Sequence, residues 1–418
     1  MDNRKETIIL NAFDRIERGG GRILTRLRKL VAIPSVNPPG ERYFEMVSCL
    51  QEECIKLGMK TEIHQVPKKV AEAAGVAAEF PRYNLLARWD VGASKTLHFN
   101  AHYDVVPAPG SWRYGPFDPC EHKGWLYGRG SGDMKGSIVS LFTAIDAIRM
   151  SGVKPVFNIE CSLTADEETG GQLGAGYVVN EGLIDADYTV VCEGAAGTRV
   201  GLGHNGVLWL QCHVKGKSAH AARPELGRNA FEAMTKIVHG LQRYKDQLLT
   251  SSRCYRDVNG KKRYPTVTIG GVFGGVGQKV NTVPGDAMFS LDRRILPNEH
   301  LSHVERELRS CISLGAATQP QVRCRVETAL RIEPCVTNAN LPMPQSFAKS
   351  VKVVRRRVAE FHTTNGFTDL HYFVRDAGLP GVGYGVNGDR AHGVDERVRL
   401  RDVAQTAKIY SHFMLTGI

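Results

Sequence analysis

The stretch LHFNAHYDVVP (residues 97–107) combines a fold signal with a chemical one. It begins as an apolar strand and ends on two polar side chains, His102 and Asp104. Side chains two residues apart leave an extended chain on the same face. A carboxylate often orients the ring of a metal-binding histidine. The stretch therefore predicts a strand that delivers a candidate ligand, His102, together with its support, Asp104.

Extended and helical patterns alternate on both sides of this strand. The predicted strands of the first half are residues 84–89, 96–100, 156–163 and 188–192, and the predicted helices are residues 22–31, 41–57 and 136–151. Strands separated by helices predict an α/β fold with a mainly parallel sheet covered on both faces. In such sheets, ligands bind at the carboxyl ends of the strands.

The pattern changes near residue 205, where strands and helices follow in the order β-α-β-β-α-β. The segments are residues 207–214, 229–244, 267–273, 287–291, 300–312 and 322–330. This order is typical of a small open-faced α+β sandwich. After residue 334 the first pattern resumes and ends in a predicted helix over 402–415. We therefore expect an α+β domain (residues 205–328) inserted into a catalytic domain formed by residues 1–204 and 329–418.

Composition and charge narrow the functional classes. The chain has 418 residues, of which 42% are hydrophobic and 23% charged, as expected for a globular chain with a large core. No stretch approaches the roughly 20 apolar residues that span a bilayer, and the first residues do not resemble a signal peptide. The net charge of +11 is spread along the chain, and we interpret its densest run, KVVRRR (residues 352–357), as a solvated helix face. These features predict a soluble, cytoplasmic protein that binds neither membrane nor nucleic acid.

Several further segments place acids or a histidine where ligands are expected. GRGSGDMKG (residues 128–136) puts Asp133 in a glycine-rich turn before a helix, where it could equally cap that helix. The Walker pattern of a phosphate-binding loop is absent from this turn. DEETGG (residues 166–171) follows a strand, and its three adjacent carboxylates need either cations or solvent to offset their repulsion.

Two more segments complete the set. TVVCEG (residues 189–194) ends a strand on Glu193, and RAHGVDERV (residues 390–398) carries His392 and Glu396. Histidines and carboxylates gathered at one sheet edge match the nitrogen and oxygen ligands of zinc or a similar divalent ion. A shared aspartate with two ligands on each ion is the arrangement that two-metal hydrolases use.

With these residues the chain resembles the zinc aminoacylase and carboxypeptidase family that includes acetylornithine deacetylase, succinyl-diaminopimelate desuccinylase and glutamate carboxypeptidase. The resemblance runs from about residue 30 to the carboxyl terminus. Besides Glu193, its ordered motifs are HYDVVP (102–107), GRGSGDMKG (128–136), DEETGG (166–171), GKSAHAARPELGRNA (216–230), NTVPGD (281–286), DRRILP (292–297) and AHGVDERV (391–398).

The resemblance implies a role for each matching residue. Asp133 would bridge two divalent ions, zinc first, with cobalt or manganese as alternatives. His102 and Glu193 would complete one site, and His392 and Glu168 the other. Asp104 would orient His102. Glu167 would be the general base that takes a proton from the metal-bridged water and passes it to the leaving amine. The family also often has a cis peptide after the bridging aspartate, here Asp133–Met134.

For the inserted domain the resemblance implies a lid that also forms a homodimer; higher assembly stays open. His220 would steady the developing oxyanion in the partner subunit's site, although a surface histidine is the alternative. Asn281 and Arg294 would hold the substrate, with the guanidinium binding a carboxylate. Arg294 fits the family's Asp-x-Arg pattern better than Arg293.

These expectations define a metal-dependent amidohydrolase or deacylase, related to metallopeptidases, that cleaves an N-acyl amino acid or a similar small anionic substrate. The sequence leaves two alternatives open: an aminohydrolase or N-carbamoyl hydrolase with the same metal centre, and a binding protein on the same fold. The chain departs from the family at YGVNG (residues 384–388), where a Gly-Pro-Gly is usual, and at GFTDLHYF (residues 366–373), which carries an extra histidine, His371. We expect both segments near the substrate pocket.

Overall fold

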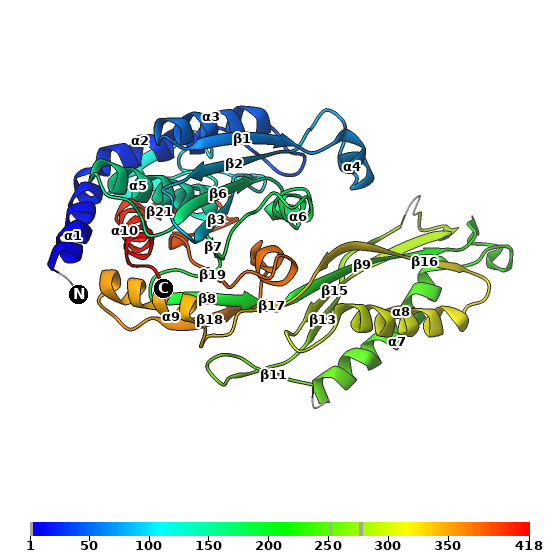
Figure 1. Ribbon diagram of the computed structural model, residues 1–418. Helices are drawn as coiled ribbons and strands as arrows, with labels where there is room; N and C mark the ends of the chain where they lie inside the picture. Colours follow the sequence, from blue (N-terminus) through cyan, green and yellow to red (C-terminus); the bar gives the residue numbers. More distant parts are fainter. Residues whose placement is uncertain (1–2, 251–252, 276–278) are drawn as a thin grey trace. The chain divides into compact units, whose positions relative to one another are not determined.

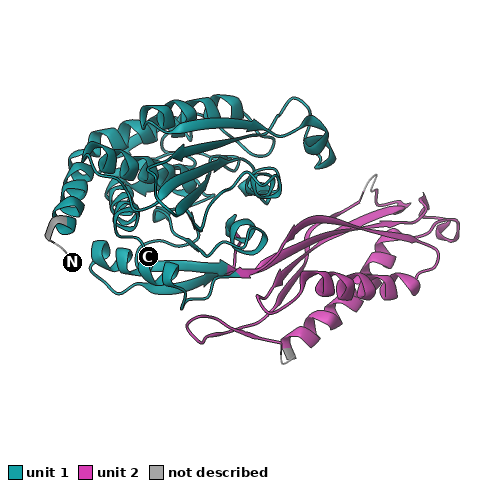
Figure 2. Cartoon of the chain, viewed as in Figure 1, with its two compact units in different colours: residues 1–203, 336–364, 368–418 teal, residues 204–335, 365–367 magenta. Residues whose placement is uncertain are grey.

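The computed structural model describes residues 3–250, 253–275 and 279–418 (Figure 1). The chain forms two compact units, shown in different colours in Figure 2. Unit 1 comprises Met1–Gly203, Val336–Thr364 and Thr368–Ile418, and unit 2 comprises His204–Cys335 and Asn365–Phe367. The inserted segment therefore ends at Cys335 and not at residue 328, because its last strand continues to Ile332.

Unit 1 contains a nine-stranded sheet with the order β1-β2-β6-β3-β7-β19-β8-β17, and β18 pairs with β8. Strands β6, β3, β7 and β19 run parallel, whereas β1–β2, β2–β6 and β19–β8 are antiparallel pairs. The bounds are β1 Lys60–Gln65, β2 Tyr83–Trp89, β3 Thr96–His102, β6 Asn158–Thr164, β7 Tyr188–Val191, β8 Arg199–His204, β17 Cys335–Val336, β18 Glu360–Thr364 and β19 Gly381–Gly383. The predicted α/β class with a mainly parallel sheet is confirmed.

Both faces of this sheet are covered, as strand β3 shows. Neighbouring residues of a strand point to opposite faces. Phe99 packs against Tyr410 of helix α10, with ring centroids 5.3 Å apart, and His98 packs against Phe373 at 4.6 Å. Helix α5 contacts α10 and is buried along nearly its whole length, which explains why its sequence is apolar all round.

Helices and a second, smaller sheet complete unit 1. The helices are α1 Asn3–Arg18, α2 Gly20–Val31, α3 Tyr43–Lys56, α4 Lys68–Ala73, α5 Gly136–Met150, α6 Ala175–Asn180, α9 Pro342–Arg355 and α10 Leu400–Thr416. The smaller sheet has the order β20-β21-β5-β4, with bounds β4 Cys120–His122, β5 Trp125–Tyr127, β20 Gly388–Asp389 and β21 Arg397–Arg399. Short turns are η1 Ser131–Lys135, η2 Glu167–Thr169 and η4 Tyr372–Asp376.

Three of the four basic residues in the run at 352–357 are exposed, as its sequence predicts, and Arg355 is the exception. Helix α9 ends at Arg355, and Arg356 adopts the left-handed conformation with φ 54°. The Arg355 side chain is only 10% exposed and its Nη1 lies 2.7 Å from Asp402 Oδ1. Arg355 thus fastens α9 to α10 inside unit 1, and Lys352, Arg356 and Arg357 are the exposed members. Among the helices that the structure describes, none combines the length and apolarity needed to cross a membrane.

Histidine 98 makes the stability of unit 1 sensitive to acid. Its ring is fully buried between Thr189 Oγ1 and Ser162 Oγ, at 2.9 and 2.8 Å, and burial lowers its pKa to about 3. The unfolded histidine has a pKa of about 6.5, so between these values only the unfolded chain binds the proton. Stability is therefore fully present above pH about 6.5 and falls as the pH drops towards 3, by on the order of 4 kcal/mol.

This effect is measured as the unfolding midpoint of the wild-type chain and of His98→Gln across this pH range. Glutamine can hydrogen-bond to the same hydroxyls without titrating. We expect the wild type to lose stability relative to the variant as the medium becomes acidic. Two curves that stay parallel would show that His98 does not contribute.

The main sheet of unit 2 is antiparallel, has the order β13-β15-β9-β16 and is covered by helices α7 and α8. The bounds are β9 Gly206–Lys215, α7 Ala230–Thr250, β13 Thr266–Gly274, β15 Asp286–Ile295, α8 Leu301–Ala317 and β16 Arg323–Ile332. The chain order is therefore the predicted β-α-β-β-α-β. Smaller elements are β10 Ala219–His220, η3 Pro224–Leu226, β11 Tyr255–Arg256, β12 Lys262–Arg263 and β14 Thr282–Val283.

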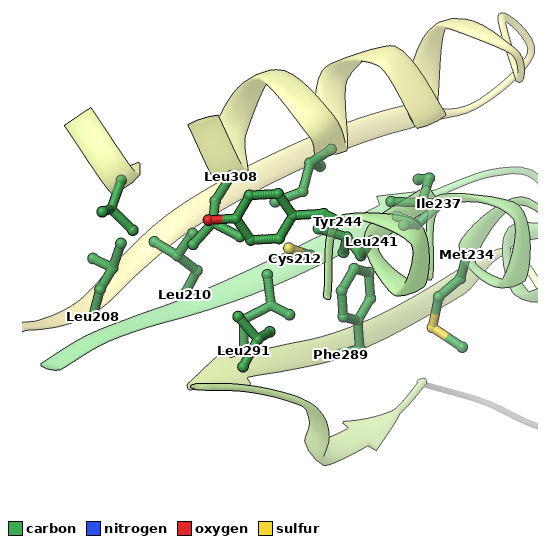
Figure 3. Close-up of a cluster of buried hydrophobic side chains, with 14 of the residues drawn as sticks. Leu208, Leu210, Cys212, Met234, Ile237, Leu241, Tyr244, Phe289, Leu291 and Leu308 are labelled. Atoms are coloured by element: carbon green, nitrogen blue, oxygen red, sulfur yellow. The ribbon is translucent and has the colours of Figure 1, made fainter. Parts of the chain in front are cut away.

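The core of unit 2 lies between this sheet and its two helices (Figure 3). Every second residue of β15 is buried, which is the period of a strand with one covered face. Phe289 and Leu291 of β15 and Leu210 of β9 meet Ile237 and Leu241 of α7 in this core (Figure 3). Helices and sheet thus form a self-contained layer pair with its own apolar interior.

Candidate metal centre

The sheet of unit 1 brings three of the predicted ligands to one edge. His102 is the last residue of β3, Glu168 lies in turn η2 after β6, and Glu193 follows β7. Strands β6, β3 and β7 are neighbours and run parallel, so their carboxyl ends meet at the same edge. The other two ligands come from loops: Asp133 lies in turn η1 and His392 between β20 and β21.

Asp133 stands between two sets of ligands. Its Oδ1 lies 3.3 Å from His102 Nε2, and its Oδ2 lies 3.4 Å from His392 Nε2. The same His392 nitrogen is 3.0 Å from Glu168 Oε2, and His102 Nε2 is 3.9 Å from Glu193 Oε2. Each carboxylate oxygen of Asp133 thus faces a different histidine, which is the geometry of a bridging ligand.

These side chains form two groups that suit divalent ions. The groups are His102, Asp133 and Glu193, and Asp133, Glu168 and His392; within each group the ligand atoms lie within 4.8 Å of one another. Oε1 of Glu168 and Oε1 of Glu193 are buried and hydrogen-bond to no described residue. A buried carboxylate oxygen without a partner is costly unless a cation or water satisfies it. The histidine nitrogens and carboxylate oxygens of these two groups therefore fit zinc or a similar divalent ion.

The pKa values of the two histidines also indicate that this site favours positive charge. The neighbouring Asp133 and Glu168 carboxylates raise the pKa of His392 to about 10. Burial opposes a charged ring at His102, yet hydrogen bonding to Asp104 and Asp133 raises the pKa of His102 well above its usual value. The surrounding carboxylates thus favour positive charge at both places where an ion would sit.

Glu167 lies beside the two groups and belongs to neither. Its Oε2 is 4.0 Å from His102 Nε2, and its side chain is 9% exposed. Burial, followed by the negative charge of Glu193, raises the pKa of Glu167 well above its usual value. Glu167 is therefore a buried carboxyl group beside the ligand groups, and its surroundings favour the protonated form.

Asp104 does more than the sequence predicts. His102 Nδ1 lies 3.1 Å from the backbone carbonyl of Asp104 and 3.4 Å from its Oδ1. A carbonyl only accepts hydrogen bonds, so Nδ1 carries a proton, and a ring that has lost its second proton would have its lone pair at Nε2, facing Asp133. The Asp104 carboxylate also accepts from the backbone N–H groups of Glu167 and Glu168, both at 3.3 Å. It therefore fixes the backbone of Glu167 and Glu168 as well as the ring of His102.

The first acid of the DEETGG motif is structural. Asp166 is buried in the left-handed conformation, with φ 63°, and accepts hydrogen bonds from Arg82 Nε at 2.8 Å and Tyr43 Oη at 2.9 Å. Asn37 Nδ2 donates to Asp166 Oδ1 at 3.1 Å and to Asp104 Oδ2 at 2.9 Å. This network turns the motif so that its second and third acids face the centre. The three partners come from distant segments that no local motif connects.

The remaining predicted site residues lie in unit 2. His220 is exposed and its Nδ1 accepts from Ala222 N–H at 3.1 Å. Ala221 N–H donates to the carbonyl of Asn281 at 2.9 Å, so that His220 and Asn281 lie close together in the β10–β14 pair. Arg294 is 30% exposed and forms a two-point contact with Asp292, at 2.9 and 3.0 Å.

Arg293 is buried and its Nη2 donates to Glu299 Oε1 at 2.6 Å. Of the two neighbouring arginines, only Arg294 is accessible to a substrate.

Several residues of the two segments that depart from the family pattern, 366–373 and 384–388, are buried. Tyr384 is fully buried and donates to the carbonyl of Gly197 at 2.8 Å. The expected position of the two segments near a substrate pocket stays a prediction. His371 is 3% exposed, with Nδ1 2.9 Å from the carbonyl of Thr368. Asp369 was missed; it is 1% exposed, and burial raises its pKa to about 7. Asp369 is visible in the sequence GFTDLHYF (residues 366–373), but it does not follow a predicted strand, so no pattern in the sequence singled it out.

The turn that holds Asp133 has a cis peptide between Asp133 and Met134, as the resemblance implies.

An α/β unit that gathers two histidines and three carboxylates at its strand ends and adjoining loops is typical of a metal-dependent hydrolase. The model of peptidase family M20/M25/M40 matches residues 98–416, and the chain belongs to this family. It is accordingly a hydrolytic enzyme of the peptidase and deacylase type that acts on amide bonds, and its family is metal-dependent.

Two curated relatives and one solved structure illustrate the similarity. Succinyl-diaminopimelate desuccinylase of Paracoccus denitrificans is 28% identical over 348 residues, which cover 79% of this chain and 85% of that protein. Acetylornithine deacetylase of Aliivibrio fischeri is 30% identical over 278 residues, 66% of this chain and 68% of that protein. The dipeptidase Dug1p of Saccharomyces cerevisiae shares the fold with a TM-score of 0.78 at 16% identity, covering 97% of this chain and 98% of that one.

Proposed function

We propose that this chain is a dinuclear amidohydrolase that cleaves the C–N bond of an N-acyl amino acid or a similar small, carboxylate-bearing substrate. The observation that carries the proposal is the position of Asp133, whose two oxygens face two separate histidines. Zinc is the proposed metal, and the same oxygen and nitrogen ligands accept cobalt or manganese.

The reaction divides between the ions and the residues around them. When bound, a pair of divalent ions lowers the pKa of water and polarises the scissile carbonyl. Glu167 takes a proton from the attacking water and delivers it to the leaving nitrogen, because it is buried at the centre and is not part of either ligand group. Asp104 keeps His102 in the tautomer whose Nε2 faces Asp133.

The substrate class rests on the relatives and on unit 2. The relatives are named for removing succinyl and acetyl groups from amino acids. We propose that Arg294 and Asn281 hold the substrate, with the Arg294 guanidinium on its carboxylate. His220 would stabilise the charge on the attacked carbonyl oxygen in the partner subunit's site. Asp292 occupies only part of the Arg294 guanidinium, which has five N–H donors in all.

Assembly and location belong to the same proposal. We propose a homodimer formed through unit 2, whose edge strand β13 carries the exposed apolar side chains Val272 and Phe273. Light scattering of the full chain measures its mass directly. A cytoplasmic location is compatible with ten free thiols, which reducing conditions preserve.

The substrate class is tested with the chain loaded with zinc and a panel of N-acetyl, N-succinyl and N-carbamoyl amino acids beside aminobenzoates. We expect turnover of N-acyl amino acids, and a turnover of the same compounds by Glu167→Gln that is about 10²–10⁴-fold slower. Turnover of N-carbamoyl compounds alone would indicate an N-carbamoyl hydrolase. Turnover of an aromatic amine alone would overturn the proposed class in favour of an aminohydrolase.

A further inference from the structure

His392 lies in a loop of the small sheet, between β20 and β21, whereas His102, Glu168 and Glu193 lie at or just after strand ends of the main sheet. The His392 side chain is 55% exposed, whereas those of His102 and Glu168 are 1% and 4% exposed. Three residues of this loop, Arg390, His392 and Asp395, adopt the left-handed conformation with φ of 60–63°. Non-glycine residues keep this conformation only when their surroundings impose it. Something outside the main sheet must therefore fix this loop.

The small sheet places this loop against the loop of Asp133. Strands β21 and β5 pair with Arg397 opposite Tyr127, which aligns the segments that precede and follow them. Strand β20, which precedes this loop, approaches the turn of Asp133 so closely that a Cβ on Gly132 would lie 2.8 Å from the Cα of Gly388. Only glycine fits at this contact.

A buried ion pair joins the two loops at this point. Arg129 and Glu396 are 1% and 0% exposed, and Arg129 Nη1 donates to Glu396 Oε2 at 2.6 Å. Glu396 Oε1 accepts from the backbone N–H groups of Gly132 and Asp133, at 3.0 and 3.1 Å. Arg129 Nη2 donates to the backbone carbonyl of His392 at 3.2 Å. One pair thus contacts the backbone of both Asp133 and His392.

Arg129 has no room to act on a substrate. It is 1% exposed, its Nη2 also donates to the carbonyl of Pro107 at 3.2 Å, and its guanidinium lies 5.2 Å from the ring centroid of Trp112. The planar fork of Arg129 spreads its donors over two terminal nitrogens, one for the carboxylate and one for the two carbonyls, whereas a lysine has a single nitrogen.

We propose that Arg129 and Glu396 are positioning residues that set the distance between His392 and Asp133 and thereby create the ion site formed by Asp133, Glu168 and His392. This inference rests on the proposed dinuclear centre. Partners that orient metal ligands typically change metal affinity by about 10–100-fold when they are replaced. The site formed with His102 and Glu193 depends on strands of the main sheet and should change much less.

The test is a titration of the metal-free full chain with Zn²⁺ against a chromophoric chelator, which resolves the affinity of each site. The variants are Arg129→Met, Glu396→Gln and the double variant. We expect each single variant to keep one tight site and to weaken the other about 10–100-fold. The double variant should be no worse than either single variant, because both remove the same link.

Two further variants separate this role from a general loss of stability. Arg129→Lys keeps the charge but loses the fork, and we expect it to weaken the same single site; it decides the matter if Arg129→Met fails to fold. Arg26→Met removes a partly buried arginine that pairs with Glu53 and Asp146 in the same unit, and should lower the unfolding midpoint while keeping both zinc affinities.

Two tight sites in every Arg129 and Glu396 variant would overturn the positioning role and leave the dinuclear centre intact. Absence of tight zinc binding by the wild-type chain would instead overturn the centre itself, and the positioning role with it.

Discussion

Glu167→Gln is expected to lower kcat about 10²–10⁴-fold while the chain keeps its metal. The amide has nearly the shape of the carboxyl group but cannot carry the proton between water and the leaving nitrogen. Glu167 contributes no atom to either ligand group, and its backbone N–H, which Asp104 accepts at 3.3 Å, is unaffected by the change. The loss should therefore appear in kcat and not in metal content. Steady-state kinetics with metal analysis of the same sample measure both quantities.

The same substitution at the neighbouring Glu168 is expected to have a different effect. Glu168→Gln changes a side chain whose Oε2 lies 3.0 Å from His392 Nε2 and whose Oε1 is buried without a partner among the described residues. We expect this variant to lose metal from one site as well as activity. Glu167→Gln with wild-type kcat would exclude Glu167 as the base, and a loss of metal in that variant would make it a ligand.

Asp133→Ala is expected to remove the most binding energy of any single change, because this residue belongs to both ligand groups. Each of its oxygens faces a different histidine, at 3.3 and 3.4 Å, so its loss opens both sites together. We expect the variant to bind neither ion tightly and to have no measurable turnover, with unit 1 still folded by circular dichroism.

The matched control is Asp187→Ala, which removes a carboxylate of unit 1 that pairs with Lys95 at the surface. This control should retain both ions and full activity. Retention of one tightly bound ion by Asp133→Ala would mean that Asp133 serves a single site and does not bridge.

The sequence predicted those features that depend on local pattern. Apolar runs marked β3, β6 and β7, and each run ended on the acid or histidine that the sheet then brings to a common edge. The β-α-β-β-α-β order of unit 2 was readable for the same reason, since strand and helix periods differ. Local pattern does not indicate where an element stops against its neighbours, and strand β16 therefore extends beyond its predicted end.

The hydrogen bonds and ion pairs that support the site could not be predicted from the sequence, because they join residues that are far apart in the chain. Arg129 and Glu396 are separated by 267 positions, and Arg82 and Asp166 by 84. Only the folded sheets bring these partners together. The same holds for Asp104, whose contacts with two backbone N–H groups depend on how η2 folds after β6.

The central claim is that this chain holds two divalent ions through a shared aspartate. Its most direct test is the metal content of the purified full chain after saturation with Zn²⁺ and removal of the free ion, with Asp133→Ala treated in parallel. We predict about two zinc ions for each wild-type chain and close to none for the variant. A wild-type chain that retains no tightly bound ion, or a variant that retains as many as the wild type, would contradict the account.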